Sequence, residues 1–192
     1  MNSFDFIIID PPWQNRTVKR QKTYKILSNN PQSFNSNLLI FNIPIPSILT
    51  QNGLLCLWIT NSEKIFKIAL NLIKNWKLKL IAKWHWLKIC KSGDPICEFN
   101  PSHKVPFETI LFACKPESVE NFKLIKDDFC LISIPNAYPS RKPPISILLE
   151  KLKYIKNLQN GLELFGRYLL PNFTTIGYEV IKFQNKYFFE EN

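Results

Sequence analysis

The chain has 192 residues, of which 45% are hydrophobic, and a formal net charge of +10. Its length and apolar content fit one domain over residues 1–192 with a sizeable core, and they argue against a second domain. The basic excess favours a polyanionic partner such as nucleic acid over an acidic small molecule, although a Lys-rich composition is also expected of a protein from an AT-rich genome.

The first predicted element is a strand over residues 4–9, a short apolar run rich in Ile. It is followed directly by the tetrapeptide Asp10-Pro11-Pro12-Trp13, and because proline has no backbone N–H, the strand must end there. Ligands of open parallel α/β sheets bind at the carboxyl ends of the strands. The sequence therefore predicts a site where an acid, two rigid carbonyls and an aromatic ring are presented together.

This tetrapeptide has groups that can activate a planar amine, such as the exocyclic N6 of adenine. The lone pair of that nitrogen is delocalised into the ring, so it becomes nucleophilic when hydrogen-bond acceptors hold its two protons. The Asp10 carboxylate and the Pro11 carbonyl are such acceptors, and Pro12 stiffens the turn. Trp13 can stack on the base, a contact worth about 1–3 kcal/mol in single-strand readers. The alternative is a structural Pro-Pro turn followed by a core tryptophan.

The next stretch, residues 14–25, is basic: it contains Arg16, Lys19 and Arg20 and no acidic residue. A loop of this charge beside an amine-activating group is predicted to hold phosphates that flank the target nucleotide, with a merely solvated loop as the alternative. Residues 28–37 are rich in Asn and Ser and form a predicted linker within the domain. A short helical turn is expected at Ile48-Leu49.

A β-α-β unit follows. The apolar run 54–60 predicts a strand, Asn61 and Ser62 are candidate caps, and apolar residues recur at helical spacing up to Trp76. The run 78–87 predicts a strand that returns parallel to the first by the usual right-handed crossover.

Trp86 and Lys88 lie at the end of this last strand, on the side of the sheet where Trp13 is expected. Aromatic rings and an ammonium suit a base-stacking wall with one phosphate or base-edge contact. Core tryptophans are the ordinary alternative, above all for Trp84. The long loop 90–106 that follows contains His103 and Lys104, and loops of this length often carry function.

The rest of the chain predicts further elements of an α/β sheet. These are strands over 107–114 and 129–134, a helix that starts at Pro143-Pro144, a strand over 162–165, and the segments 174–177 and 180–183, which finish the sheet. Gly166 follows the strand 162–165, and a glycine there lets a ligand approach the backbone closely. Residues 186–192 are expected to be a frayed tail.

Six stretches, in this order, carry a resemblance to a known family: Asp10–Arg20, Lys83–Ile89, Ser92–Asp94, Ser102–Lys104, Pro106–Glu108 and Glu163–Arg167. They resemble the MT-A type Asp-Pro-Pro-Trp adenine-N6 methyltransferases, typified by the seventy-kilodalton subunit of mRNA adenosine methyltransferase, and within these the methyltransferase-like protein four branch. The resemblance implies S-adenosyl-L-methionine-dependent (AdoMet-dependent) N6 methylation of adenine or adenosine in nucleic acid, with RNA slightly ahead of DNA. A methyltransferase or nucleic-acid-binding partner subunit is a further expectation.

The resemblance also implies the fold. We expect an α/β, Rossmann-like AdoMet-dependent methyltransferase fold of circularly permuted order, in which the catalytic strand comes first and the cofactor strand late. Its central sheet should be mostly parallel, with helices on both faces. The absence of a Gly-x-Gly-x-x-Gly pattern disfavours an ordinary dinucleotide-binding fold.

Residue by residue, the resemblance implies roles for three sets. The catalytic set is Asp10, Pro11, Pro12 and Trp13. The cofactor set comprises Lys142 for the methionine carboxylate, Glu163 for the ribose and Arg167 for the polar end or the adenine edge, together with Asp10, Phe165, Gly166, Tyr178 and Glu179. The substrate set is Arg16, Lys19, Arg20, Trp86, Lys88, His103 and Lys104.

Two tyrosines depart from the family pattern. Tyr178 stands where the family usually has Asn, and Tyr168 follows Arg167 where the branch tends to have Asn. These departures and the short segment before Asp10 leave open an alternative, a non-catalytic nucleic-acid-binding scaffold subunit of a methyltransferase complex.

The sequence also bears on metal binding, membrane association and cellular compartment. The set His85, Cys90, Cys97 and His103 has the spacing of no standard zinc site, so no metal is expected. No apolar run approaches the ~20 residues that cross a bilayer, the start shows no signal-peptide pattern, and the cysteines form no Cys-x-x-Cys. We therefore expect no membrane partner, and a place in the nucleus or cytosol rather than the mitochondrion.

Overall fold

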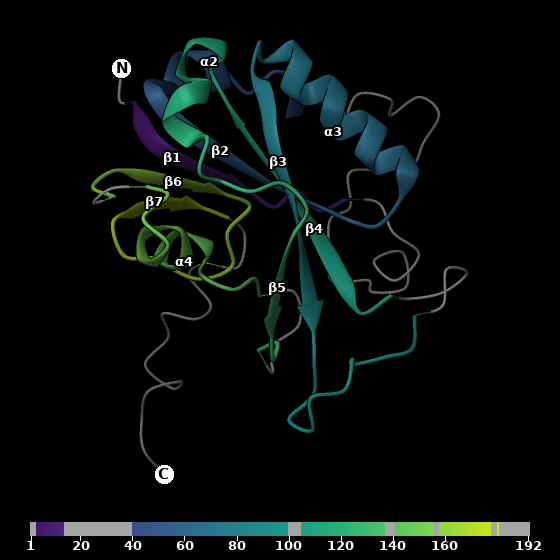
Figure 1. The fold of residues 1–192 in the computed structure, drawn as a ribbon. Helices are drawn as coiled ribbons and strands as arrows, with labels where there is room; N and C mark the ends of the chain where they lie inside the picture. The colour runs from purple at the N-terminus through teal and green to yellow at the C-terminus, as the bar shows by residue number, and fades with distance from the viewer. Residues whose placement is uncertain are drawn as a thin grey trace.

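The computed structural model describes residues 3–13, 40–99, 105–136, 141–155, 158–177 and 180. In chain order (Figure 1), its elements are β1 (Phe4–Ile9), α2 (Ile45–Ile48), β2 (Leu49–Ile59), α3 (Glu63–Asn75), β3 (Lys79–Lys88), β4 (Phe107–Cys114), the 3-10 helix η3 (Pro116–Phe122), β5 (Phe129–Ser133), α4 (Ile145–Lys151), β6 (Gly161–Leu164) and β7 (Phe173–Ile176).

The strands form one sheet in the order β5-β3-β4-β2-β1-β6-β7. The pairs β1 with β2, β1 with β6, β3 with β5 and β6 with β7 are parallel, whereas β4 is antiparallel to both β2 and β3. The predicted mostly parallel sheet is therefore confirmed. β3 runs in the direction of β2, as expected, but β4 lies between them.

The first strand and the late strand β6 are neighbours, with Ile8 opposite Glu163. This adjacency agrees with the permuted order, because elements from the two ends of the chain meet in the middle of the sheet. β1 is apolar from Phe6 to Ile9 because both of its faces are buried there: Ile7 and Ile9 face one core cluster, and Phe6 and Ile8 face the other.

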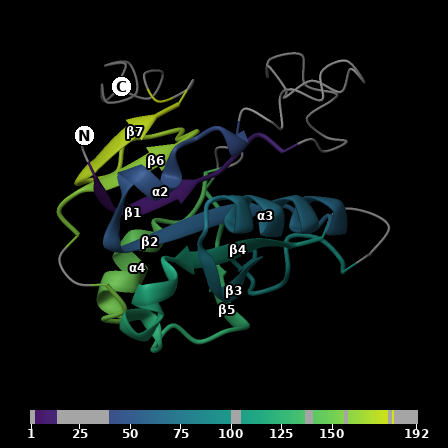
Figure 2. The ribbon, with the colours of Figure 1, turned by 90° about the horizontal axis from the view of Figure 1, so that it is seen from above.

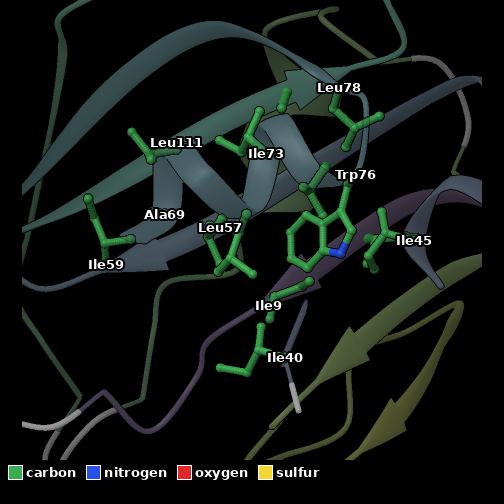
Figure 3. Packing of buried hydrophobic residues seen from close by; sticks show 14 of the residues in the cluster. Ile9, Ile40, Ile45, Leu57, Ile59, Ala69, Ile73, Trp76, Leu78 and Leu111 are labelled. Atoms are coloured by element: carbon green, nitrogen blue, oxygen red, sulfur yellow. The ribbon is translucent and has the colours of Figure 1, made fainter. Parts of the chain in front are cut away.

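Helices cover both faces of the sheet, as predicted. The apolar side of α3 packs on the first cluster, where Trp76 at the end of the helix lies beside Ile9, Ile45 and Leu57 (Figure 3). On the other face, Leu149 of α4 and Phe122 of η3 pack on the second cluster. Figure 2 shows α3 and α4 well separated, with strands of the sheet between them.

Several boundaries differ from the expectation. The helical turn ends at Ile48, and β2 begins at Leu49, so the strand is longer than the apolar run alone predicted. Ser62 takes the N-cap position of α3 without a capping hydrogen bond from its side chain, and Asn61 instead donates its amide to the Phe107 carbonyl. Val180 is not part of a strand, which contradicts the expected start of a last strand there.

Four predicted segments lie outside the described residues: the basic loop 14–25, the linker 28–37, residues 181–183 and the tail 186–192. In the part of the chain that the structure describes, no helix is long and apolar enough to cross a bilayer.

Candidate active site

The candidate site lies where β1 and β6 end side by side. Asp10 follows β1 directly, and its backbone N–H donates to the Leu164 carbonyl at 3.3 Å. Since Glu163 sits opposite Ile8 in the parallel pair, the Asp10 and Glu163 carboxylates come from adjacent strands at one edge of the sheet. This is the edge at which parallel α/β sheets bind ligands.

Four side chains form an alternating chain of charges, which we call the charge cluster: Asp10, Lys142, Glu108 and Lys88. Lys142 Nζ lies 3.2 Å from Asp10 Oδ2 and 2.7 Å from Glu108 Oε2, and Glu108 Oε1 pairs with Lys88 Nζ. Each side chain is only 14% to 23% exposed. Ion pairs shielded to this extent are screened by salt less than surface pairs.

The sheet topology explains how these residues meet. Lys88 ends β3, and Glu108 lies at the start of β4. Because β4 is antiparallel, its start lies at the same edge as the ends of β1 and β3. Lys142 comes from the segment that leads into α4.

The cluster sets the protonation of its members. Burial raises the pKa of Asp10, and the charge of Glu108 adds to this, while Lys142 and Arg167 act in the opposite direction. Burial also opposes ionisation of Glu108 and of Lys142, but their attraction to oppositely charged neighbours prevails, so the pKa of Glu108 is lowered and that of Lys142 is raised. Asp10 is thus the cluster's better proton acceptor, held beside a permanent positive charge.

Two tryptophan rings lie against the ammonium groups of the charge cluster. Lys88 Nζ lies 4.6 Å from the ring centroid of Trp86, and Lys142 Nζ lies 5.4 Å from that of Trp58. The two indoles pack edge to face with centroids 5.9 Å apart. Because aromatic faces attract cations, the two indole rings help to hold both ammonium groups in place.

Burial of Trp13 and Trp86 contradicts the expectation that their rings stack on a base. Trp13 is 4% exposed and donates its indole N–H to the Trp58 carbonyl at 2.7 Å. Trp86 is 2% exposed and donates to Ser133 Oγ at 2.8 Å, while Trp84 is fully buried. All three are core side chains with satisfied N–H groups, which is the alternative that the sequence left open.

The proline turn after Asp10 is closed locally. The Trp13 backbone N–H donates to the Pro11 carbonyl at 2.7 Å. A carbonyl oxygen has two lone pairs, so Pro11 keeps one acceptor position beyond this bond.

Glu163 ends up buried beside the cluster, 8% exposed. Burial raises its pKa to about 7, and the charge of Asp10 adds to this, against a small opposing contribution from Thr175. The Thr175 hydroxyl donates to Glu163 Oε2 over a long 3.5 Å, so most of the acceptor capacity of the carboxylate remains.

The chain turns tightly after Glu163. Phe165 has φ of +63°, in the left-handed region that non-glycine residues seldom adopt. A Cβ at Gly177 would lie 1.9 Å from the Gly166 carbonyl oxygen, and one at Gly166 would lie 2.6 Å from Glu163 Oε2. The two glycines therefore let the ends of β6 and β7 meet backbone to backbone against the carboxylate.

Of the predicted site residues, the structure brings together Asp10, Pro11, Lys88, Lys142, Glu163, Phe165, Gly166 and Arg167, whose charge reaches Asp10. Arg16, Lys19, Arg20, His103, Lys104, Tyr178 and Glu179 lie outside the described residues. Sequence reasoning missed Glu108 as a site residue. Its signal was present in the stretch Pro106–Glu108, but only the reversed strand places it in the cluster.

The family described as MT-A70 matches residues 4–179. The chain is 37% identical over 196 residues to the human (Homo sapiens) "N(6)-adenine-specific methyltransferase METTL4", covering 97% of this chain and 39% of that protein.

Two further relatives carry names with different nucleic acids. A Caenorhabditis elegans "DNA N6-methyl methyltransferase" is 36% identical over 190 residues, covering 98% of this chain and 49% of that protein. A Pyricularia oryzae "N6-methyladenosine RNA methyltransferase MTA1" is 32% identical over 189 residues, covering 96% and 49%. The chain thus spans half or less of the length of each of these relatives. The family match extends from β1 past the end of β7 and includes the residues after both β1 and β6. The chain therefore belongs to the MT-A70 family.

Proposed function

We propose that this chain is an AdoMet-dependent methyltransferase that acts on the N6 amine of adenine or adenosine in nucleic acid, with RNA ahead of DNA. The observation that carries the proposal is the intact Asp10-Pro11-Pro12-Trp13 at the end of β1, with the Asp10 carboxylate near enough for its charge to raise the pKa of Glu163 on the neighbouring strand. The relatives are named for N6 methylation of adenine, in two cases on DNA or on RNA. Because this chain matches only part of each relative, we propose the same activity for it.

Membership of a methyltransferase family implies a methyl-donor cofactor, and the residues at the end of β6 fit AdoMet. Glu163 keeps acceptor capacity for the two hydroxyls of a ribose. Gly166 and Gly177 let the ends of β6 and β7 approach each other closely, which places a tight turn directly beside the Glu163 carboxylate. Arg167 and Lys142 supply positive charge for a carboxylate. When bound, AdoMet supplies the methyl group.

The chain's own residues prepare the amine. The Asp10 carboxylate and the second lone pair of the Pro11 carbonyl accept hydrogen bonds from the two N6–H groups, which makes the nitrogen lone pair more available. These contacts strengthen as the nitrogen becomes positive, so they stabilise the transition state more than the ground state. The N6 atom would gain one N–C bond to the methyl group, whose bond to the sulfonium sulfur would break, and it would lose one proton. The raised pKa of Asp10 suits its carboxylate to accept this proton.

Lys142 keeps this acid in place and in its reactive form. Two of its three N–H donors go to Asp10 and Glu108, which leaves one for a bound carboxylate. Glu108 and Lys88 close the charge balance, so the cluster as a whole is neutral with Asp10 ionised.

The test is direct. Wild-type protein is incubated with AdoMet and single-stranded RNA or DNA oligonucleotides, which are then digested and analysed by mass spectrometry for N6-methylated nucleosides. We expect N6-methyladenosine from the RNA, and no product with Asp10→Asn, which keeps the size of the side chain. Methylation at a cytosine or at N1 of adenine would contradict the proposal.

A second candidate is the non-catalytic scaffold subunit. It is favoured by one observation: the predicted base-stacking rings of Trp13 and Trp86 are buried. Titration calorimetry with AdoMet separates the two. Heat from the wild type, and tighter binding by Tyr178→Asn, would support the enzyme, whereas no heat from either at millimolar AdoMet would favour a scaffold that needs a partner subunit. Both candidate functions involve nucleic acid, so we propose a location in the nucleus or the cytosol.

A further inference from the structure

We infer that Tyr168 is a positioning residue of the site: its phenol hydroxyl anchors the main chain of Lys142 and thereby fixes where the Lys142 ammonium stands between Asp10 and Glu108. The geometric part of this inference stands on the described contacts alone. Its effect on methyl transfer rests on the proposed function.

The contact joins two separate segments. Tyr168 Oη donates to the Lys142 carbonyl at 2.8 Å, which links the turn after β6 to the segment before α4. The Arg141 guanidinium lies 5.6 Å from the centre of the same ring. One tyrosine thus holds two consecutive residues, one through its hydroxyl and one through its face.

The segment that carries Lys142 needs such an anchor. Residues 141–144 have no regular secondary structure, and α4 begins only at Ile145. Pro143 and Pro144 have no N–H, so the two positions after Lys142 cannot donate a main-chain hydrogen bond. A bond to the Lys142 carbonyl is therefore an effective way to fix this stretch of backbone.

Fixing the backbone fixes the ammonium. A lysine side chain has four rotatable bonds, and Lys142 Nζ must stay within 3.2 Å of Asp10 Oδ2 and 2.7 Å of Glu108 Oε2 at once. If the Lys142 Cα is held in place, less conformational entropy is lost when the ammonium is ordered between the two carboxylates. Loss of the anchor would leave Lys142 near the site but less often between them.

The anchor is also insensitive to pH. Burial raises the pKa of Tyr168 to about 12, and the negative charge of Glu163 adds to this, while Arg141 acts in the opposite direction. The phenol therefore stays protonated, and stays a donor, throughout the range in which Asp10 titrates.

Tyr168→Phe removes only the hydroxyl and keeps the ring packing. Its matched control is Tyr154→Phe, which removes a hydroxyl from a ring that packs edge to face on Trp84. The primary readout is the pKa of Asp10, followed by carbon NMR of protein labelled at the aspartate carboxyl carbons and assigned with Asp10→Asn. This readout needs neither cofactor nor activity.

Because a nearby ammonium lowers the pKa of a carboxyl, Tyr168→Phe should raise the pKa of Asp10 by about 0.5 to 1 units, a part of the full effect of an opposite charge at this distance. The other charged or titratable groups that act on Asp10 or feel it, Glu108, Arg167, Glu163 and Cys56, are unchanged in both variants. No shift in Tyr168→Phe, or an equal shift in Tyr154→Phe, would overturn the inference.

A double-mutant cycle tests the route of the effect. In a Lys142→Gln background, Tyr168→Phe should no longer move the pKa of Asp10, because the ammonium it positions is gone. An undiminished shift there would show that Tyr168 acts by some other path. If Lys142→Gln does not fold, the comparison with Tyr154→Phe decides alone.

Activity gives a second, separable readout. Tyr168→Phe should lower kcat for methyl transfer by about tenfold with little change in KM for the oligonucleotide, since misplacing a catalytic group affects the chemical step. If the wild type transfers no methyl group at all, the proposed function fails, but the NMR comparison still decides the role of Tyr168.

Discussion

At the scale of single residues, Asp10 has two roles that substitutions can separate. It faces the site, and it is one of two partners of a mostly buried lysine. Asp10→Asn should reduce methyl transfer by at least about 100-fold, the usual contribution of a proton acceptor. Asp10→Ala should do the same and also lower the free energy of unfolding by about 1–3 kcal/mol, because Lys142 loses a partner. Urea unfolding of both variants checks this.

The control is Asp94→Ala in an exposed loop, where the carboxylate accepts from Ser92 at 2.8 Å. It should retain full transfer. Wild-type rates in Asp10→Asn would remove the carboxylate from the mechanism.

Glu163 makes stability depend on pH. Its pKa is about 7 in the folded chain against 4.5 without the fold, so between these values the folded state binds the additional proton. The contribution of Glu163 to stability should therefore fall as pH rises from about 4.5 to 7, by up to about 3 kcal/mol, and this contribution should be constant above that range. Denaturant unfolding at several pH values measures it. Glu163→Gln should flatten the dependence, and an unchanged slope in that variant would assign it to another group.

The residue scale is also where sequence reasoning was least complete. The tetrapeptide predicted a site at the edge of the sheet where the charge cluster lies. It did not reveal that Trp13 turns into the core, because a tryptophan after a turn suits a ligand and a core equally well. Nor did it reveal Glu108, since an acid at the start of a strand lies at the opposite edge in a parallel sheet.

At the scale of elements, the apolar runs predicted β1, β3, β4, β5 and β6 to within two residues. A strand that is buried on both faces has a continuous apolar run in its sequence, so such strands can be predicted from the sequence. The order of strands was not readable, because the antiparallel insertion of β4 depends on pairings between distant segments. The missing cap of α3 has a similar cause, since Asn61 finds a tertiary partner instead.

The meeting of β6 and β7 gives an element-scale prediction. Gly177→Ala would place a methyl group 1.9 Å from the Gly166 carbonyl oxygen, so the strand ends must separate. We expect a loss of about 2–4 kcal/mol in the free energy of unfolding and a weaker AdoMet affinity, measured by urea unfolding and calorimetry.

Thr174→Ala, on an exposed position of the same strand, is the control and should change stability by less than about 1 kcal/mol. If Gly177→Ala were as mild as this control, the close approach would have no energetic importance.

At the scale of the whole molecule, the net charge of +10 predicts salt-dependent binding to nucleic acid. The basic loop 14–25 lies outside the described residues, but its charge makes it the first place to test. Replacing Lys19, Arg20 and Lys22 with Ser should lower the slope of log affinity against log salt for a single-stranded oligonucleotide by up to roughly 2 units, at about 0.7 per phosphate contact. The same triple replacement at Lys64, Lys67 and Lys74 of α3 is the control. Equal slopes for the two would mean that the loop is only solvated.

The position of β1 between β2 and β6 has a consequence for how the chain is made. Residues near the start are joined to residues near 160: the Asp5 N–H donates to the Asn160 carbonyl, and the Asn160 amide donates to the Ser3 carbonyl. As the ribosome produces the chain, an apolar strand therefore waits with one edge unpaired until more than 150 residues have followed it. Long-range closure of this kind slows folding and exposes a template for aggregation, so nascent chains stalled before β6 should depend on chaperones, and those stalled after β7 should not.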